Sequence, residues 1–324
     1  MCENRWEFLR KRLFFLFFIK SCGIMKKSLS KEKRKMKTYH IISNPTAGQE
    51  KTKKKLLTVE KIFSAKGVPV QTHLTGCVGD ATEIVKHLTQ AGEKEIIALG
   101  GDGTLHEVLN GLHDPTACHL GLIPSGTGND FAEKVGLSKD PEVATKFILE
   151  NEPKPTNYIQ IGDKRCMNIA GLGMDVDVLE RCKKGKLRGK IKYLMSLLQS
   201  LFKYKGCKIK VTVDGKEEEH DALIGAVCNG SQFGGGIKIC PPAKVDDDKL
   251  DAVIVDCIGG KIKLIKALLQ LLKGKIIDYP ATKHFLCEKL SIIPKYPCTL
   301  QMDGELYKNV TFDVKVGKGL LFYR

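Results

Sequence analysis

The run Glu95-Ile96-Ile97-Ala98-Leu99 is followed directly by Gly100-Gly101-Asp102-Gly103-Thr104, and helix-forming residues continue to residue 112. A short apolar segment of this kind predicts a buried strand. Consecutive glycines let main-chain N–H groups approach an anion closely, and the start of the following helix adds the positive end of its dipole. The run therefore predicts a phosphate-binding turn between a strand and a helix.

Asp102 stands in the middle of this turn. Its carboxylate would repel a bare phosphate, so its position predicts a metal ion that mediates the contact. The alternative is an ordinary strand-to-helix turn in which Asp102 caps the helix.

Short apolar runs alternate with helical periodicity on both sides of the turn. Strands are predicted at residues 39–42, 68–74, 95–99 and 119–123, and helices at residues 53–66, 81–91 and 105–112. This alternation predicts a parallel sheet with helices on both faces, which is the doubly wound α/β arrangement. Ligands of such sheets bind at the carboxyl ends of the strands.

Two further polar turns fall at that edge of the predicted sheet. Ser43-Asn44-Pro45-Thr46-Ala47-Gly48 ends the first strand, and Pro124-Ser125-Gly126-Thr127-Gly128-Asn129-Asp130 ends the fourth. Together with residues 100–104 they are placed to surround one nucleotide. The P-loop pattern, the dinucleotide-binding GxGxxG pattern and the HRD and DFG motifs of protein kinases do not occur.

The second half of the chain has a different texture. After a Pro-rich link at residues 151–155, strands separated by glycine and aspartate turns predict a mainly antiparallel β domain. Helical stretches at residues 190–203 and 261–273 interrupt it.

From Lys37 to the C-terminus the chain resembles the diacylglycerol kinase catalytic-domain family of bacterial soluble lipid kinases, a superfamily that also includes sphingosine and ceramide kinases. The resemblance rests on residues 44–48, 100–107 and 126–130, which match the nucleotide motifs of that family in order and spacing, and on residues 228–236 and 241–251 in the second half.

The resemblance implies an N-terminal doubly wound nucleotide-binding domain at residues 37–156, with residues 306–324 as an expected return to it. A C-terminal mainly antiparallel β-sandwich domain for the lipid substrate follows at residues 157–305, and the active site lies in the cleft between the two. The implied reaction is transfer of the γ-phosphoryl group of ATP, with Mg²⁺, to the hydroxyl of diacylglycerol or a similar lipid alcohol.

The resemblance also implies the residues that contact the nucleotide, which are Asn44, Pro45, Thr46, Ala47, Gly48, Thr75, Gly101, Asp102, Gly103, Thr104, Leu105, His106, Glu107 and Thr127. Asp102 and Asp130 are expected to position Mg²⁺ through water. Gln49 departs from the Lys that the family often has, so Lys51 or Lys53 is expected to supply that charge.

Two acidic elements of the second half match the family as well. Met302-Asp303-Gly304-Glu305 matches its DGE element, which implies Asp303 as the general base and Glu305 as a supporting carboxylate; read alone, Asp-Gly is simply a hairpin turn. A structural Mg²⁺ is implied at Asp247 with the main-chain carbonyls of Lys244 or Val245 and of Lys249. Because Asp248 stands where a Gly is common, the choice among Asp246, Asp247 and Asp248 stays open.

A neutral lipid must be bound through its acyl chains, at about 0.8 kcal/mol per buried CH₂. Amphipathic segments with basic ends at residues 186–205 and 262–272 could line the cleft or dock on anionic lipid, or they could simply pack on the β domain. The expected location is cytoplasmic and peripheral at the membrane. The sequence leaves the oligomeric state open, a homodimer included.

The net charge of +16 is concentrated at the start of the chain, because residues 1–37 hold twelve Lys or Arg against three Glu. The rest of the chain shows no nucleic-acid motif, and no nucleic-acid partner is expected. The apolar run at residues 13–19 is far shorter than the about 20 residues of a membrane-spanning helix. Residues 1–36 are interpreted as a basic leader that is disordered or precedes the true start of translation, with an interfacial anchor as the alternative.

Cysteine and histidine spacing predicts no zinc site, and the twelve cysteines are interpreted as reduced thiols. Two rival functions share part of this pattern. NAD kinase shares a GGDGT-type turn, but the only Asn-Glu pair, Asn151-Glu152, lies in the Pro-rich link. A pseudokinase that binds nucleotide or lipid without turnover is disfavoured because Asp102, Asp130 and Asp303 are all present.

Overall fold

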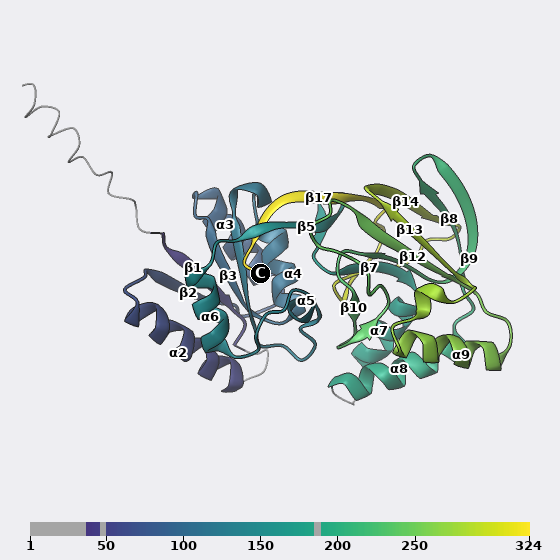
Figure 1. Cartoon of the computed structure of the whole chain (residues 1–324), viewed down its shortest axis with the longest axis horizontal. Coiled ribbons are helices and arrows are strands. Elements are labelled where there is room, and N and C mark those ends of the chain that lie inside the picture. Colours follow the sequence, from purple (N-terminus) through teal and green to yellow (C-terminus); the bar gives the residue numbers. More distant parts are fainter. Residues whose placement is uncertain (1–36, 46–49, 185–188) are drawn as a thin grey trace, which may run out of the picture. The chain divides into compact units, whose positions relative to one another are not determined.

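The computed structural model describes residues 37–45, 50–184 and 189–324. Residues 38–324 form one compact unit, in which an α/β lobe and a β-sandwich lobe are joined by two long strands (Figure 1). The expectations for the leader at residues 1–36 and for Thr46, Ala47, Gly48 and Gln49 lie outside the described residues.

Four parallel strands in the order β2-β1-β3-β4 form the sheet of the α/β lobe. They are β1 (Tyr39–Ser43), β2 (Val70–Leu74), β3 (Glu95–Gly100) and β4 (His119–Pro124). β1 lies between β2 and β3, so the chain first runs from β1 to β2 on one side and then crosses over to β3 and β4 on the other side. The switch point of the sheet therefore falls between the carboxyl ends of β1 and β3, where ligands of such folds bind.

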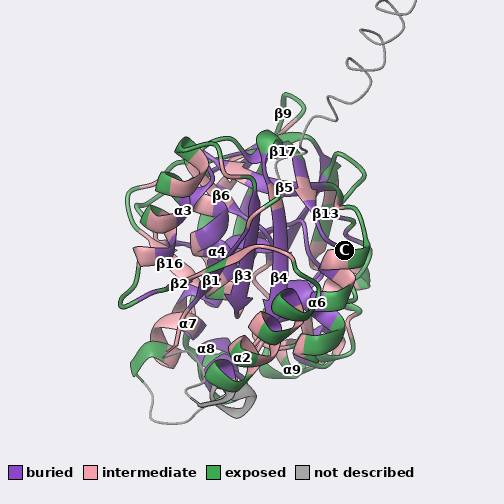
Figure 2. Cartoon of the chain, turned by 90° about the vertical axis from the view of Figure 1, so that its left-hand side faces the viewer, coloured by how far each residue is buried: buried purple, intermediate pink, exposed green. Residues whose placement is uncertain are grey.

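Alternate residues of these strands feed two separate cores. Ile96 and Ala98 of β3 pack on the side of α3 (Asp80–Gln90) and α4 (Asp102–Gly111). Ile97 and Leu99 pack on the opposite side, against α2 (Glu50–Ala65) and α6 (Pro141–Glu150). Figure 2 shows these strands buried in the centre with the helices exposed around them. Each fully buried aliphatic side chain contributes about 1.5–3 kcal/mol, so the strand-to-helix turns are carried by a rigid base.

The second lobe is a β-sandwich. Its strands are β6 (Lys164–Cys166), β7 (Ile169–Gly173), β8 (Cys207–Val213), β9 (Lys216–Cys228), β12 (Leu250–Asp256), β13 (Thr282–Cys287), β14 (Lys289–Pro294), β15 (Leu300–Met302) and β16 (Glu305–Tyr307), with a separate hairpin of β10 (Gln232–Phe233) and β11 (Ile237–Lys238). One cluster of buried apolar side chains fills the interior of the sandwich. A second cluster lies between the outer face of β7, β9 and β12 and three helices, α7 (Met174–Lys184), α8 (Gly189–Lys203) and α9 (Lys261–Leu272).

Two strands belong to both lobes. β5 (Lys154–Ile161) and β17 (Phe312–Phe322) run antiparallel to each other along most of their length. The first part of β17 also pairs with β14, whereas Leu321 and Phe322 pair in parallel with β4. The pairing with β5 shifts register between Gly317 and Leu320.

The strands predicted in the first half and the two helices predicted in the second half are present within a few residues. Three helices were not predicted, namely α5 (Asp130–Lys134), α6 and α7. Asp102 does not cap its helix: Gly101 takes that place with an extended backbone, and Asp102 is the first helical residue. None of the described helices combines the length and the apolar composition that a membrane crossing requires.

The pairing of β5 with β17 can be tested at Gly317. A Cβ added there would overlap the buried ring of Tyr158 on β5, so Gly317→Ala is expected to lower the free energy of unfolding by about 1–3 kcal/mol. Urea denaturation measures the change. Gly259→Ala, at which a Cβ would meet open space, is the control and should change stability little; equal effects of the two variants would contradict the packing described.

Candidate active site

Three turns meet at the switch point of the sheet. The N–H of Ser125 donates to the carbonyl of Gly100 at 2.8 Å, and the N–H of Thr75 donates to the carbonyl of Ser43 at 3.0 Å. A Cβ on Gly126 would lie 2.5 Å from the Cα of Gly101. Only glycine permits this approach of the two main chains, so the glycines of the second and third turns are needed to bring those turns together.

Side chains stabilise the third turn through hydrogen bonds to its main chain. Asn129, at φ 55°, accepts from the N–H of Gly126 at 2.9 Å and donates to its carbonyl at 2.7 Å. The ammonium of Lys55 donates to the carbonyls of Pro124 and Lys139 at 2.6 and 2.8 Å. Lys55 thus supplies a positive charge at this edge, whereas Lys53 is exposed and the side chain of Lys51 lies outside the described ones.

Two carboxylates converge on Gly128. A Cβ on Gly128 would lie 3.0 Å from Oδ2 of Asp102 and 3.4 Å from Oδ2 of Asp130. Asp102 accepts from the main-chain N–H groups of Asp130 and Phe131 at 3.2 and 3.3 Å. Burial, and after it the charge of Asp130, raise the pKa of Asp102 to about 6. Paired oxygen ligands of this kind suit a hard cation such as Mg²⁺, which would relieve their repulsion.

Asp130 reaches across to the sandwich lobe. Its Oδ1 accepts from Nε2 of Gln232 at 3.1 Å, and its Oδ2 accepts from the N–H of Gly235 at 2.8 Å. Both donors lie in or beside the hairpin of β10 and β11. The buried carboxylate of Asp130 therefore ties this hairpin to the α/β lobe.

Asp303 makes the reverse contact from the sandwich lobe. It occupies the turn between β15 and β16 at φ 51° and accepts from Nδ1 of His106 at 3.0 Å. Main-chain N–H groups of Met167 and Asn168 donate to it at 2.8 Å each, and the N–H of Ile169 and the thiol of Cys166 lie at 3.3 and 3.1 Å. Burial alone would raise the pKa of Asp303, but the hydrogen bond and charge of His106 and the main-chain donors hold it below its usual value.

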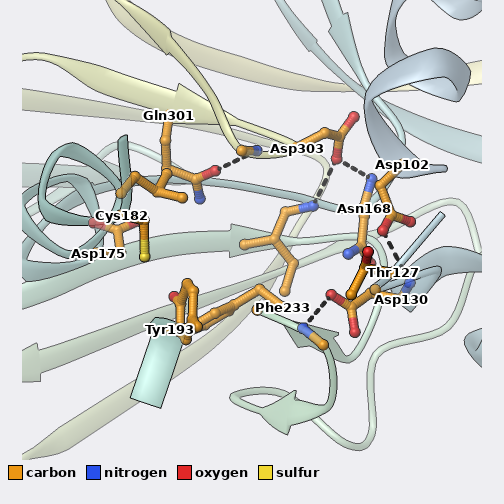
Figure 3. A pocket seen from close by; sticks show the side chains of 16 residues that line it. Asp102, Thr127, Asp130, Asn168, Asp175, Cys182, Tyr193, Phe233, Gln301 and Asp303 are labelled. Carbon is orange, nitrogen blue, oxygen red and sulfur yellow. Dashed lines mark hydrogen bonds between the residues drawn. The ribbon is translucent and has the colours of Figure 1, made fainter. Parts of the chain in front are cut away.

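A cavity of about 320 Å³ lies between these groups. Figure 3 shows Asp102, Asp130 and Asp303 at one end of it, with Tyr193 and Phe233 at the other. Thr127 lies on the carboxylate side, and Ile169 and Leu179 add to the apolar wall. The cavity thus has a charged end formed by the glycine-bearing turns and an apolar end formed by the sandwich lobe.

Asp175 lines the cavity and was missed in the sequence. It follows Gly171-Leu172-Gly173 at the junction of β7 and α7, and a Cβ on Gly171 would overlap its carboxylate. Burial raises the pKa of Asp175 to about 6. Glycines at a strand end followed by Asp in the first helical turn also occur at Gly100-Gly101-Asp102, and this shared pattern was the signal that could have identified it.

The residues expected to bind nucleotide fall into two groups. Thr75, Gly101, Asp102 and Thr127 lie in or next to the three turns, and Asn44 and Pro45 directly follow β1. Thr104 packs beneath Gly100. The side chains of the next three residues have other partners than the turns. Leu105 is in the apolar core, and His106 bonds to Asp303 and to the hydroxyl of Tyr307, the latter at 2.6 Å. Glu107 accepts from the N–H of Ala81 at 3.3 Å.

The three aspartates of the acidic loop at residues 244–249 differ in their contacts. Asp246 pairs with Arg324 at 2.9 Å, and Asp248 accepts from Nδ2 of Asn157 at 2.9 Å. Asp247 accepts at 3.1 Å from the N–H of Lys249 within its own turn. The carbonyl of Val245 accepts from the N–H of Asn157 at 2.6 Å. Of the three aspartates, Asp247 is thus the one whose contact lies within its own turn.

Comparison with known proteins agrees with this architecture. Residues 38–161 match the diacylglycerol kinase catalytic domain family, and residues 168–321 match the family described as the YegS C-terminal NAD kinase beta sandwich-like domain. A diacylglycerol kinase of Bacillus subtilis is 30% identical over 279 residues, which cover 83% of this chain and 90% of that protein. A YegS-like lipid kinase of Cronobacter sakazakii is 29% identical over 269 residues, covering 81% and 88%.

The fold is shared with a solved structure as well. The crystal structure of a diacylglycerol kinase from Bacillus anthracis superposes with a TM-score of 0.72 at 25% identity, covering 89% of this chain and 96% of that one. The chain belongs to the diacylglycerol kinase family of lipid kinases. It is therefore an enzyme of the kinase class, which implies the use of ATP and a lipid substrate.

The raised pKa of Asp102 predicts a pH dependence of stability. Between the pKa of an unfolded aspartate, about 3.9, and the folded value of about 6, only the folded state holds the proton. The contribution of Asp102 to stability is thus present at low pH and is lost as the pH rises through about 6. Urea denaturation in chelator should show the unfolding free energy of wild type, relative to Asp102→Asn, falling by about 2 kcal/mol between about pH 4.5 and pH 7.5.

Asp175 titrates in both proteins and cancels from this difference. Added Mg²⁺ should stabilise the wild type more than Asp102→Asn at pH 7.5, because the site proposed at Asp247 is common to both proteins. A difference between the two proteins that does not change with pH would contradict a raised pKa of Asp102.

Proposed function

We propose that this chain transfers the γ-phosphoryl group of Mg-ATP to the free hydroxyl of diacylglycerol. The observation that supports this most directly is one cavity that has carboxylates and a glycine-bearing turn at one end and apolar side chains at the other, in a chain of the lipid kinase family. Phosphoryl transfer requires hydrogen-bond donors and a cation that neutralise the charge on the transferred group. Binding of a lipid alcohol requires apolar walls around its acyl chains.

The three turns would hold the phosphates of ATP. The close contact of Gly101 with Gly126 places main-chain N–H groups of two turns and the start of α4 at one point. Such groups bind phosphate without a charged side chain. We propose that Asn44 to Gly48, Thr75, residues 101–107 and Thr127 contribute to this nucleotide site through main chain and hydroxyls rather than through the buried side chains of Leu105 and His106.

Asp102 and Asp130 would hold the Mg²⁺ that accompanies ATP, directly or through water. When bound, the cation supplies neutralisation of charge on the phosphates. Asp130 is fixed for this task by Gln232 and Gly235, and Asp102 by two main-chain N–H groups. We further propose a structural Mg²⁺ at Asp247 with the carbonyls of Lys244 and Lys249.

The contacts of Asp303 support a different role from the general base expected from the sequence. Its side chain is 2% exposed, it accepts from five neighbouring donors, and its pKa is lowered, which makes it a weak proton acceptor. Glu305, two residues on, has a side chain that is 47% exposed with Lys183 at 3.5 Å. We propose that Asp303 positions the turn and orients His106, and that Glu305 takes the proton of the lipid hydroxyl.

The apolar end of the cavity would receive the glycerol backbone and the first part of the acyl chains. Tyr193, Phe233, Ile169 and Leu179 form its walls. Asp175 and Gln301, whose side chains are hydrogen-bonded to each other, are polar groups on this side, and we propose that Asp175 also accepts a hydrogen bond from the lipid headgroup. The longer parts of the chains would remain outside the cavity, in a membrane.

The activity is tested with the full-length chain, Mg-ATP and mixed micelles that contain diacylglycerol, sphingosine or ceramide, and with NAD as a separate acceptor. Phosphorylation of diacylglycerol is expected. Glu305→Gln should lower kcat by about 10²–10⁴-fold with little change in Tm. Asp303→Asn should lower kcat and also Tm, because the NH₂ group that replaces one carboxylate oxygen then faces the N–H of either Met167 or Asn168.

These variants separate the proposals. A Glu305→Gln enzyme with wild-type kcat would return the base to Asp303. Product formed only on another lipid would keep the mechanism and replace the substrate, whereas product formed only on NAD, or none at all, would refute the proposed lipid kinase activity of this chain.

Exposed apolar side chains support a further proposal, peripheral contact with an anionic membrane. One face of α8 and α9 packs on the sandwich through buried residues such as Leu197, Leu201 and Leu271. Along α9 the other face carries Ile262, Ile265, Leu269 and Leu272, of which Ile262 is 73% exposed. Exposed Lys261, Lys263, Lys266, Lys273 and Lys275 flank this face. Each such Lys near anionic lipid adds about 1 kcal/mol of attraction.

The double variant Ile262→Ser with Ile265→Ser is expected to bind vesicles of phosphatidylglycerol at least about 10-fold more weakly, because two apolar side chains no longer insert. Its kcat on a short-chain, micelle-free diacylglycerol should not change. Ile293→Ser, on the exposed surface of β14, is the control. Cosedimentation with vesicles measures binding, and unaltered binding of the double variant would contradict the assignment of this face.

A further inference from the structure

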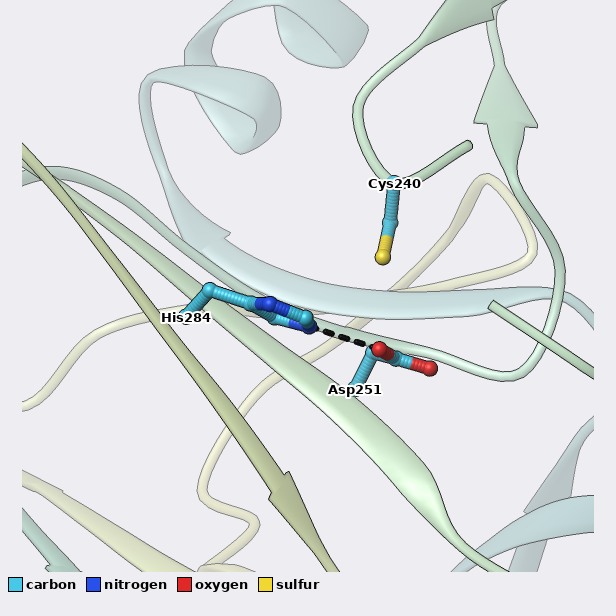
Figure 4. Close-up of side chains that lie close together, drawn as sticks. All are labelled: Cys240, Asp251 and His284. Carbon is cyan, nitrogen blue, oxygen red and sulfur yellow. Dashed lines mark hydrogen bonds and ion pairs between the residues drawn. The ribbon is translucent and has the colours of Figure 1, made fainter. Parts of the chain in front are cut away.

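Three potential metal ligands of different chemical types meet outside the proposed active site. They are the thiol of Cys240, the carboxylate of Asp251 and the imidazole of His284, and one ligand atom from each lies within 4.8 Å of the others. Nε2 of His284 is 2.6 Å from Oδ1 of Asp251. In Figure 4 the sulfur of Cys240 points at the gap where these two side chains meet.

The register of three strands explains the meeting. Asp251 of β12 lies opposite Cys228 of β9 and opposite Leu286 of β13. Directly opposed residues share a face of the sheet, and so do residues two apart on one strand. His284 therefore faces the same side as Asp251 and Cys228. Cys240, which follows β11, approaches this face from above, and its side chain also contacts those of Cys228 and His284.

This ligand set suits zinc better than a hard cation. Thiolate and imidazole together select Zn²⁺ over Mg²⁺ or Ca²⁺, and a carboxylate is an accepted third ligand. Around Zn²⁺ the ligand atoms would be roughly 3.3–3.8 Å apart, so side-chain shifts within an ångström or so convert the observed cluster. The thiol of Cys228 lies outside this group of three but contacts the thiol of Cys240, so it is the neighbouring group that could complete a tetrahedral set. Cys240 and Asp251 are buried, while the His284 side chain is 29% exposed and leaves a path for entry.

We propose that Cys240, Asp251 and His284, with Cys228, form a structural site for Zn²⁺ or a similar thiophilic divalent cation. The consequence lies in the chain between Cys228 and Cys240. This segment contains Gln232 and Gly235, the two donors that fix Asp130, and Phe233 of the apolar wall. A metal bound at both ends of the segment would close it into a loop and hold these groups in place.

The tag-free, full-length chain is reduced, stripped with chelator and titrated with Co²⁺ and then Zn²⁺ in the absence of nucleotide. One equivalent of Co²⁺ should give thiolate charge-transfer absorption and tetrahedral d–d bands, which Zn²⁺ abolishes. Zn²⁺ should also raise Tm by at least about 3 °C and slow amide exchange in residues 229–240. Cys240→Ala and His284→Gln should each weaken binding by more than about 100-fold.

Two variants serve as controls that must retain binding. Cys287→Ala removes a thiol from the same strand as His284 that faces the interior of the sandwich instead, and Asp247→Asn removes a ligand of the proposed Mg²⁺ site. The proposal is overturned if the wild type shows no thiolate charge transfer, if Cys240→Ala binds as tightly as the wild type, or if the isolated chain carries a Cys228–Cys240 disulfide and no metal.

Discussion

Two buried carboxylates, one from each lobe, depend on donors that the other lobe supplies. Asp303 of the sandwich accepts from His106 of α4, and Asp130 of α5 accepts from Gln232 and Gly235 of the sandwich. Losing either cross-lobe contact would weaken the compensation of a buried charge, although Asp303 would keep its donors at residues 166–169, so both contacts favour the arrangement in which the lobes stay in register. The cavity lies between these two contacts, and its dimensions are therefore set by them rather than by the flexible ends of side chains.

Asp102 and Asp303 line the same cavity, yet their environments move their pKa values in opposite directions. Both are buried. Asp303 is compensated by an imidazole and several main-chain N–H groups, whereas Asp102 has two longer main-chain hydrogen bonds and a second carboxylate beside it. The first arrangement stabilises a charge that is already present and leaves it little tendency to accept a proton. The second leaves a charge unbalanced, and a cation is what balances it. Environment thus distinguishes two residues of one type in the direction of the two roles proposed for them.

The parts of this structure that could be predicted from sequence are those that local chemistry determines. Strands β1, β3 and β4 are apolar runs that end in glycine-bearing turns, and the family resemblance of those turns identified the kinase family that the comparisons confirm. The α7 helix was missed because the apolar run of β7 continues into it through Met174. The hydrogen-bond donors around Asp303 could not be predicted either, because they lie more than 130 residues away along the chain. The same holds for Cys240, Asp251 and His284, which only the register of β9, β12 and β13 brings together.

The two strands that belong to both lobes restrict the motion of one lobe relative to the other. β5 and β17 are hydrogen-bonded to each other in both lobes, so a hinge that opened the cavity would have to shear their ladder unless one position yields. That position is the register shift between Gly317 and Leu320, where Gly319 has φ 85° and the regular pairing is interrupted. Bulges concentrate bending in sheets because fewer hydrogen bonds resist it. Rotation at this point would move Asp303 and Asp130 relative to each other and would also strain the packing of Met167 and Val245 in the core of the α/β lobe. Such a rotation would also have to break the hydrogen bonds that Asn110 and Arg165 exchange and those from Arg165 to the carbonyls of Leu109 and Leu112, so the lobes are held at this point as well as across the cavity.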